Sequence, residues 1–220
     1  HLAGSSCNMR EIKKLSEEYN FKIIEDASHA IGGKYLDKPI GNCIYSDIAI
    51  YSFHPVKIIT SGEGGMATTN NEILDAKIKL YRSHGITKET KKFKYPIPGL
   101  WAYEQHELGY NYRMTDIQAS LVISQLKRLK ENVKKRNSIL LFYKKHLLNT
   151  KIDFLEIPKE NYSACHLAII KLRNFDKQFH KDFFEKMRQK RIGVQLHYSP
   201  VHLQPYYRSR GFNQGDFPSA

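Results

Sequence analysis

The sequence predicts an α/β protein in which helices cover a sheet of short strands. Helical apolar patterns alternate with short apolar runs along the chain, which is typical of layered α/β folds. Hydrophobic residues make up 41% of the 220 residues, enough to fill a core. No apolar run approaches the roughly 18 to 20 residues that cross a bilayer, so we expect a globular chain with no membrane partner.

The first expected element is an amphipathic helix. Its apolar residues Met9, Ile12, Leu15 and Tyr19 recur at helical spacing, and Asn8 is the expected cap. Apolar runs and a second helical pattern follow. They predict strands at 21–26, 47–53 and 64–69 and a helix at about 71–81.

The segment from Ser83 to Tyr112 shows little periodicity and is rich in glycine, proline and aromatic residues. Long irregular segments in compact proteins are often functional loops. We expect this segment to reach over a site or a partner.

The rest of the sequence predicts a second, smaller domain. A long helix from Thr115 to about His146 leads into a βαβ pattern. The elements of that pattern are a strand at 164–172, a helix at 176–190 and a strand at 192–198. The domain boundary is expected inside the long helix, which divides the chain into residues 1–130 and 131–220.

The formal net charge of +13 is compatible with a nucleic-acid-binding module. The lysines are dispersed along the whole chain, however, which favours solvated helix faces. We therefore expect no nucleic-acid partner. The positive field would favour a small substrate that carries phosphates.

The cysteines and histidines indicate neither a disulfide framework nor a metal site. Cys7, Cys43 and Cys165 are widely spaced and form no CxxC pair, which favours a reducing cytoplasm. His197 and His202 are five residues apart rather than four, and no third ligand accompanies them. We expect no bound metal.

Two side chains of opposite charge follow the first two predicted strands. Asp26 ends the apolar run at 21–26, and Lys57 follows the strand at 47–53. Because ligands in open α/β sheets bind at the carboxyl ends of strands, both groups are expected to converge on one crevice. The alternative for Asp26 is that it only caps the following turn.

A lysine amine that is partly desolvated can bond to an aldehyde. Pyridoxal 5′-phosphate is the aldehyde that also needs an acid, because a carboxylate must keep its ring nitrogen protonated. Lys57 and Asp26 could supply the two groups, and Ser52 and Asn111 could donate to the phosphate. The pattern therefore predicts pyridoxal phosphate as the cofactor.

Five segments carry a resemblance to a known family. "EDASHA", "SFHPVK", "GEGG", "RSHGI" and "LGYNYRMTDIQAS", in this order and at these spacings, resemble the DegT/DnrJ/EryC1/StrS sugar aminotransferases. The likeness runs over nearly all of the chain. It implies the fold-type I architecture of pyridoxal-phosphate enzymes, with a large α/β/α domain and a smaller C-terminal α+β domain.

The resemblance assigns a role to each candidate residue. Lys57 is implied as the Schiff-base lysine, Asp26 as the partner of the pyridine nitrogen, and His29 as the neighbour of the ring's phenolic oxygen. Ser52 is implied to hold the phosphate. Asn111 is implied to reach the phosphate bound by a second subunit, so the enzyme is expected to be a homodimer with shared active sites.

The sequence departs from the family pattern in two respects. Asn8 stands where relatives usually have aspartate. We interpret this as the replacement of one helix-capping residue by another. Family members also continue before "HLAG" and after "FPSA", including an upstream segment that binds the phosphate. The chain is therefore expected to be part of a longer enzyme, with residues 1–130 ending the large domain and residues 131–220 beginning the small one.

The implied reaction moves an amino group from glutamate to C4 of a UDP-linked 4-keto-6-deoxy-N-acetyl amino sugar, because "FHPVK" and "VHLQPYY" are similar to transaminases of pseudaminic acid biosynthesis. His197, Tyr198 and His202 would lie near the sugar nucleotide. The alternatives are another 4-keto or 3-keto nucleotide sugar, or a non-catalytic fragment. A related sugar dehydratase is disfavoured, since such relatives typically lose the lysine that Lys57 matches.

Overall fold

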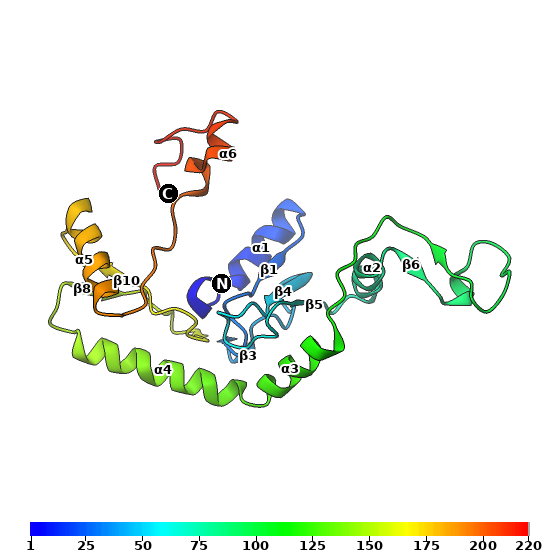
Figure 1. The fold of residues 1–220 in the computed structure, drawn as a ribbon, viewed down its shortest axis with the longest axis horizontal. Coiled ribbons are helices and arrows are strands. Elements are labelled where there is room, and N and C mark those ends of the chain that lie inside the picture. The colour runs from blue at the N-terminus through cyan, green and yellow to red at the C-terminus, as the bar shows by residue number, and fades with distance from the viewer. Residues whose placement is uncertain (220) are drawn as a thin grey trace. The chain divides into compact units, whose positions relative to one another are not determined.

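The computed structural model describes residues 1–219. The chain divides into two compact units, one ending at Lys171 and the other beginning at Leu172. Helices and short strands alternate in the first unit (Figure 1), which confirms the predicted α/β class.

A three-stranded sheet forms the centre of the first unit. Its strands are β1 (Ile24–Asp26), β4 (Ile48–Ser52) and β5 (Gly65–Thr68), in the order β1–β4–β5. Strand β1 runs parallel to β4, with Asp26 opposite Ile50, and β5 runs antiparallel to β4. The three predicted strands are confirmed, each shorter than the apolar run that predicted it.

Helix α1 (Met9–Tyr19) is confirmed together with its cap. The Asn8 side chain accepts a hydrogen bond from the Glu11 N–H at 3.4 Å, as an N-cap does. The helix joins a buried cluster that consists of Met9, Ile23, Ala27, Ala30, Tyr35 and Ile40. It therefore packs against the residues that flank β1.

Helix α2 (Glu72–Arg82) also matches its prediction, with Asn71 as its cap. Short ladders and turns accompany these elements. They are β2 (Lys34–Tyr35), β3 (Lys38–Pro39) and β9 (Asn161–Tyr162) in one sheet, β6 (Ile86–Thr87) with β7 (Glu104–Gln105), β8 (Ile152–Phe154) with β10 (Ile170–Leu172), and the 3-10 turns η1 (Leu2–Gly4) and η2 (Thr90–Lys92).

The prediction of one long helix from Thr115 to about His146 is wrong, because two helices occupy this span. Helix α3 (Asp116–Leu126) and helix α4 (Leu129–His146) are separated at Lys127 and Arg128. Val122 of α3 packs with Phe53 and Ile59. Val133 of α4 packs with Ile58 and Ala164. Each helix thus contributes a buried valine to the core.

Only the last residues of the strand predicted at 164–172 form a strand, β10. The preceding backbone is bonded to η1 instead, since Ala164 N–H donates to Gly4 and His166 N–H to Ala3, both at 2.9 Å. Gly4 has a φ of +102°, and a Cβ there would lie 2.7 Å from the Cys165 nitrogen. This close approach requires glycine.

The second unit contains α5 (Lys177–Gln189), η3 (Val201–Leu203) and α6 (Pro205–Arg208). Asp176 caps α5 by accepting from Phe179 N–H at 2.7 Å, which confirms the helix predicted there. The strand predicted at 192–198 is wrong. No strand of the described residues pairs with this segment, and extended backbone needs such a partner to satisfy its polar groups.

The two compact units differ from the predicted division at residue 130, because α4 belongs to the first unit through the buried Val133. The boundary between the large and small domains of the family fold stays a prediction. Among residues 1–219, no helix is both long and apolar enough to cross a membrane.

We predict that Ile59→Ala destabilises the first unit by about 2 to 5 kcal/mol, because Ile59 is fully buried and the surrounding side chains cannot close the cavity. Urea unfolding followed by circular dichroism measures the change. Ile117→Ala is the matched control, since Ile117 is 76% exposed on α3 and its loss should cost less than about 0.5 kcal/mol. Equal effects of the two substitutions would contradict the assigned core.

Candidate active site

Asp26 and Lys57 lie beyond the same edge of the central sheet. Asp26 is the last residue of β1, and Lys57 follows Ser52, the last residue of β4. Since β1 and β4 are parallel neighbours, their carboxyl ends meet at one edge. The structure thus brings together the two groups that the sequence predicted to converge.

The Asp26 carboxylate is held in its charged form. Ser28 N–H donates to Asp26 Oδ1 at 3.0 Å. The hydrogen bond from the Ser28 side chain is the largest cause that lowers the pKa of Asp26, and the Ser28 backbone N–H and the charges of His29 and Lys57 lower it further. The field of Lys57 therefore reaches the carboxylate across the edge of the sheet.

The loop that carries Lys57 is fastened to the end of β4 through Phe53. Phe53 N–H donates to Gly64 at 2.8 Å, and its carbonyl accepts from Ser61 N–H at 3.0 Å and from Thr60 Oγ1 at 2.7 Å. The Phe53 side chain is almost fully buried. The loop therefore returns to its starting point and presents the half-buried Lys57 at its tip.

Helix α3 clamps the same loop from the other side. The side-chain amide of Gln125 accepts from Thr60 N–H at 3.2 Å and donates to the Thr60 carbonyl at 3.0 Å. Ile58 and Ile59, directly after Lys57, are buried. These contacts determine the backbone position of Lys57.

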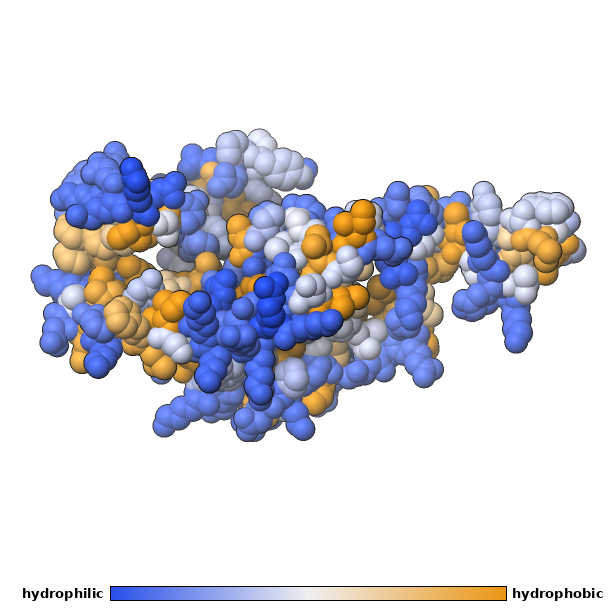
Figure 2. Space-filling model, turned by 60° about the horizontal axis from the view of Figure 1, so that its bottom comes forward, coloured by the Kyte–Doolittle hydropathy of each residue, from blue (hydrophilic) through white to orange (hydrophobic). Residues whose placement is uncertain are grey.

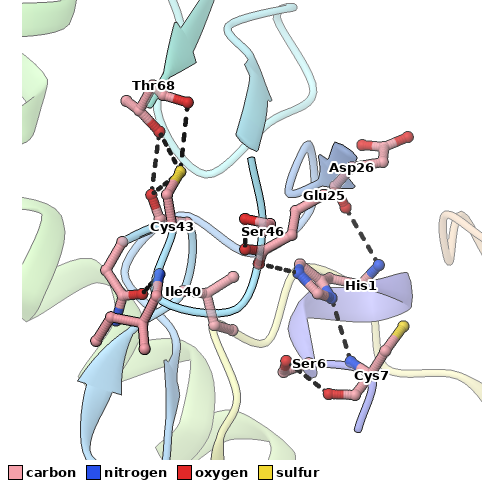
Figure 3. A network of polar contacts seen from close by, with 12 residues as sticks. His1, Ser6, Cys7, Glu25, Asp26, Ile40, Cys43, Ser46 and Thr68 are labelled. Carbon is pink, nitrogen blue, oxygen red and sulfur yellow. Dashed lines mark hydrogen bonds and ion pairs between the residues drawn. The ribbon is translucent and has the colours of Figure 1, made fainter. Parts of the chain in front are cut away.

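A polar network supports Asp26 from inside β1 (Figure 3). Glu25 is buried, its Oε2 lies 2.7 Å from His1 Nε2, and its Oε1 accepts from Ser46 Oγ. Burial alone would raise the pKa of Glu25, but the hydrogen bonds from His1 and Ser46 outweigh it and hold the pKa below its usual range. Cys7 N–H donates to His1 Nδ1 at 3.1 Å, so Nε2 carries the proton that faces Glu25.

Two further predicted residues lie near the same edge. His29 follows Asp26 by three residues, and its ring packs on that of His166 with centroids 4.4 Å apart. Ser52 pairs with Gly65 in the sheet, and its Oγ accepts from His54 N–H at 3.4 Å. Their predicted roles, beside the phenolic oxygen and at the phosphate, stay predictions.

Asn111 lies in a different setting, at the base of a hairpin formed by residues 83–112, which we call the hairpin arm. Asn111 bridges to Ser83, Tyr110 N–H donates to Tyr81 at 2.7 Å, and Tyr112 N–H donates to Arg82 at 2.9 Å. The segment predicted to be irregular is thus closed at its base. The Asn111 side chain is exposed, and its predicted service to a second subunit stays a prediction.

The residues predicted to contact the sugar nucleotide lie in the second unit. His197 and Tyr198 pack edge to face with centroids 4.5 Å apart, and His202 packs on Phe217 at 4.8 Å. Their role towards a substrate stays a prediction. Among the described residues, no group of three or more histidine, cysteine, aspartate or glutamate side chains could hold a metal ion.

Ser28 and Gln125 were missed by the sequence reasoning. Ser28 had a local signal, because an aspartate commonly accepts from the backbone two residues later. Gln125 had none, since it bonds to a residue 65 positions earlier in the chain.

Comparisons with known proteins agree with the predicted resemblance. The model of the DegT/DnrJ/EryC1/StrS aminotransferase family matches residues 1–220. A UDP-4-amino-4,6-dideoxy-N-acetyl-beta-L-altrosamine transaminase of Campylobacter jejuni is 41% identical over 94% of this chain and 52% of its own length.

Solved structures extend the likeness to the fold. Spr1654 from Streptococcus pneumoniae, assigned as a sugar aminotransferase and solved in its PMP-form, has a TM-score of 0.87 and 26% identity over 99% of this chain and 59% of its own. Helicobacter pylori PseC, an aminotransferase of pseudoaminic acid biosynthesis, has a TM-score of 0.81 and 29% identity over 94% of this chain and 53% of its own. The fold is that of fold-type I enzymes, and the chain spans about half the length of these proteins.

We predict that Ser28→Ala raises the pKa of Asp26 and that Lys57→Met raises it less, because the hydrogen bond from the Ser28 side chain, which alanine lacks, contributes more than the charge of Lys57. Carboxyl-carbon NMR titration measures both shifts. Because folding lowers this pKa, the stabilisation that comes with it is present above the usual pKa of aspartate and is lost as pH falls through the folded-state value.

The matched control for these titrations is Lys79→Met, which removes a lysine that pairs with Asp75 at 2.6 Å on α2. It should leave the pKa of Asp26 unchanged. An Asp26 pKa that ignores Lys57→Met would show that the two groups do not share a site.

Proposed function

The chain belongs to the DegT/DnrJ/EryC1/StrS aminotransferase family, and from this premise we propose that Lys57 and Asp26 are the catalytic centre of a pyridoxal-phosphate-dependent transaminase. The observation that carries the proposal is the meeting of an amine and a carboxylate at the carboxyl ends of two parallel strands. The activity proposed is that of the whole protein.

The chemistry of the side chains present fits pyridoxal phosphate. Lys57 offers an amine at the tip of a braced loop, and Asp26 stays ionised because Ser28 and neighbouring positive charges stabilise the carboxylate. Ser52 offers a hydroxyl at the end of β4. An aldehyde, a ring nitrogen and a phosphate would each find a partner among these groups.

When bound, pyridoxal phosphate supplies an aldehyde and a protonated ring that draws electrons from the carbon next to an amino group. Lys57 would hold the aldehyde end of the cofactor, and its free amine would carry the proton that leaves the donor's α-carbon. Asp26 would keep the proton on the ring nitrogen and so keep the ring able to accept electrons.

The remaining candidate residues would bind and orient the cofactor and would take no part in the proton transfer. The His29 ring would lie beside the phenolic oxygen, and Ser52 Oγ would donate to the phosphate. Asn111 would donate to the phosphate bound by a second copy of the chain, which makes the proposed active form a homodimer.

The proposed substrate is a UDP-linked 4-keto-6-deoxy-N-acetyl amino sugar that receives its amino group at C4 from glutamate. The similarity to the Campylobacter jejuni transaminase and to Helicobacter pylori PseC supports this choice over other keto sugars. The reaction would take place in the cytoplasm. Cys7, Cys43 and Cys165 are all free thiols, as a reducing compartment favours.

Borohydride reduction of the protein with pyridoxal phosphate bound should attach the cofactor irreversibly to Lys57. We expect peptide mapping to find the label in the peptide "FHPVK", because this lysine lies near enough to Asp26 for its charge to lower the pKa of that carboxyl. Lys57→Arg is the matched variant, since it keeps a positive charge but cannot bond to the aldehyde in this way. Label on another lysine in the unmodified protein would overturn the assignment.

Mixing Lys57→Ala protein with Asn111→Ala protein tests the shared site. If each site draws Lys57 from one chain and Asn111 from the other, a mixed dimer regains one intact site of its two. We expect up to about a quarter of the wild-type activity after random exchange, because half of the dimers are mixed and each carries one working site. Mixed dimers shown to form without any recovery would count against sharing.

A further inference from the structure

The hairpin arm carries a hollow lined by aromatic and proline side chains at its tip. The hollow has a volume of about 410 Å³ and lies between β6 and β7 in the chain. Its principal lining residues are Phe93, Tyr95, Pro96, Pro98, Trp101 and Tyr103. In Figure 2 this end of the molecule, on the right, combines pale and orange residues with projecting blue ones.

The faces of these rings are available to a ligand. Among the described residues, no ring-to-ring contact involves Phe93, Tyr95, Trp101 or Tyr103. Trp101 is 78% exposed and Tyr95 is 76% exposed. A flat ring that entered the hollow could stack on their free faces without displacing another aromatic ring.

Glu104 gives the hollow its shape. Its carboxylate accepts from Lys94 N–H at 2.7 Å and from Tyr95 N–H at 2.9 Å, and it lies 2.7 Å from His106 Nε2. These contacts tie the start of the tip to β7. They also occupy both carboxylate oxygens, so the acid is committed to the backbone and to His106.

Gly99 sets the position of the indole. A Cβ at Gly99 would lie 2.4 Å from the Trp101 ring, far inside contact distance. The Trp101 ring therefore packs directly over the glycine, and any larger residue must push it away.

Lysines lie next to the first lining residues of the hollow in the sequence. Residues 88–94 contain four lysines and one glutamate, all of them exposed. Lys92 pairs with Glu89 at 2.8 Å, whereas Lys88, Lys91 and Lys94 have no ion pair among the described residues. An aromatic hollow beside unpaired cations complements a ligand that joins a flat ring to phosphates.

We propose that the tip of the hairpin arm binds the nucleobase of the nucleotide-linked sugar, with the lysines of residues 88–94 facing its phosphates. This inference rests on the proposed function, because the nucleotide is that of the proposed substrate. It adds a site for the nucleotide in the hairpin arm, beyond the cofactor-binding groups at the edge of the sheet. Trp101 and Tyr95 would recognise the ring, and Glu104 and Gly99 would position them.

Trp101 is the only tryptophan of the chain, so its fluorescence reports on the hollow directly. Titration of the full chain with UDP should quench this fluorescence in a saturable way. Uridine should quench it with weaker affinity, and inorganic pyrophosphate should not, because stacking requires the ring. Adenosine diphosphate then tells whether the hollow prefers a pyrimidine or accepts any base.

Two variants test the residues. Gly99→Ala should weaken UDP binding by displacing the indole, whereas Gly193→Ala is the matched control because a Cβ there meets nothing within 4 Å. Tyr95→Ala should weaken binding about fivefold or more, measured by equilibrium dialysis, and Leu100→Ala should not, since Leu100 is fully exposed and does not line the hollow. Far-UV circular dichroism confirms that each variant is folded.

The proposal is overturned if UDP leaves Trp101 fluorescence unchanged, if pyrophosphate quenches as UDP does, or if folded Gly99→Ala and Tyr95→Ala proteins bind UDP normally. Lys57→Ala protein should still bind UDP, because Lys57 lies outside the hairpin arm. Binding of UDP without cofactor label on Lys57 would reject the proposed transaminase centre and leave the nucleotide site standing. Cofactor label on Lys57 without UDP binding would reject the nucleotide site and leave the proposed transaminase centre standing.

Discussion

The parallel pairing of β1 with β4 is the constraint on which the candidate site depends. It sets Asp26 opposite Ile50 and brings the ends of both strands to one edge of the sheet. The ladder of backbone hydrogen bonds places the two strand ends side by side, and the braced loop after β4 then positions Lys57. The buried Glu25 network and helix α1 hold β1 from the inside, so the exposed carboxylate of Asp26 stands on a rigid base.

The interruption between α3 and α4 serves the same site. On either side of it, Val122 of α3 packs beside Phe53, Gln125 of α3 bonds to Thr60, and Val133 of α4 packs beside Ile58. The Lys57 loop is therefore held by β4 at its ends, by the core through its isoleucines and by α3 through one amide side chain. A loop that is braced in this way can hold a functional side chain in a well-defined position.

The charge of the chain has two different uses in this structure. Many lysines lie on exposed helix faces, and the ion pairs formed there, such as Lys79 with Asp75, stabilise a fold very little. Lys57 differs because its charge lowers the pKa of the nearby Asp26, and Lys88, Lys91 and Lys94 differ because they precede or adjoin the lining residues of the hollow in the sequence. The net charge of the chain therefore indicates little about its function, whereas the surroundings of individual lysines indicate where a ligand could bind.

The sequence by itself determined the α/β class, the capped helix at α1, the three strands of the central sheet and the position of Asp26 and Lys57 after the ends of two neighbouring strands. These features depend on local periodicity, on caps within a few residues and on the general rule for strand ends. Tertiary structure alone decided the break at Lys127, the bonding of residues 164–166 to η1 in place of a strand, the absence of a strand partner for residues 192–198 among the described residues, the Gln125 clamp and the aromatic hollow of the hairpin arm. The physical reason is that each of these features depends on whether a partner distant in sequence is present. Gly4, for example, is the hydrogen-bond partner of Ala164, and local sequence patterns do not reveal such partners.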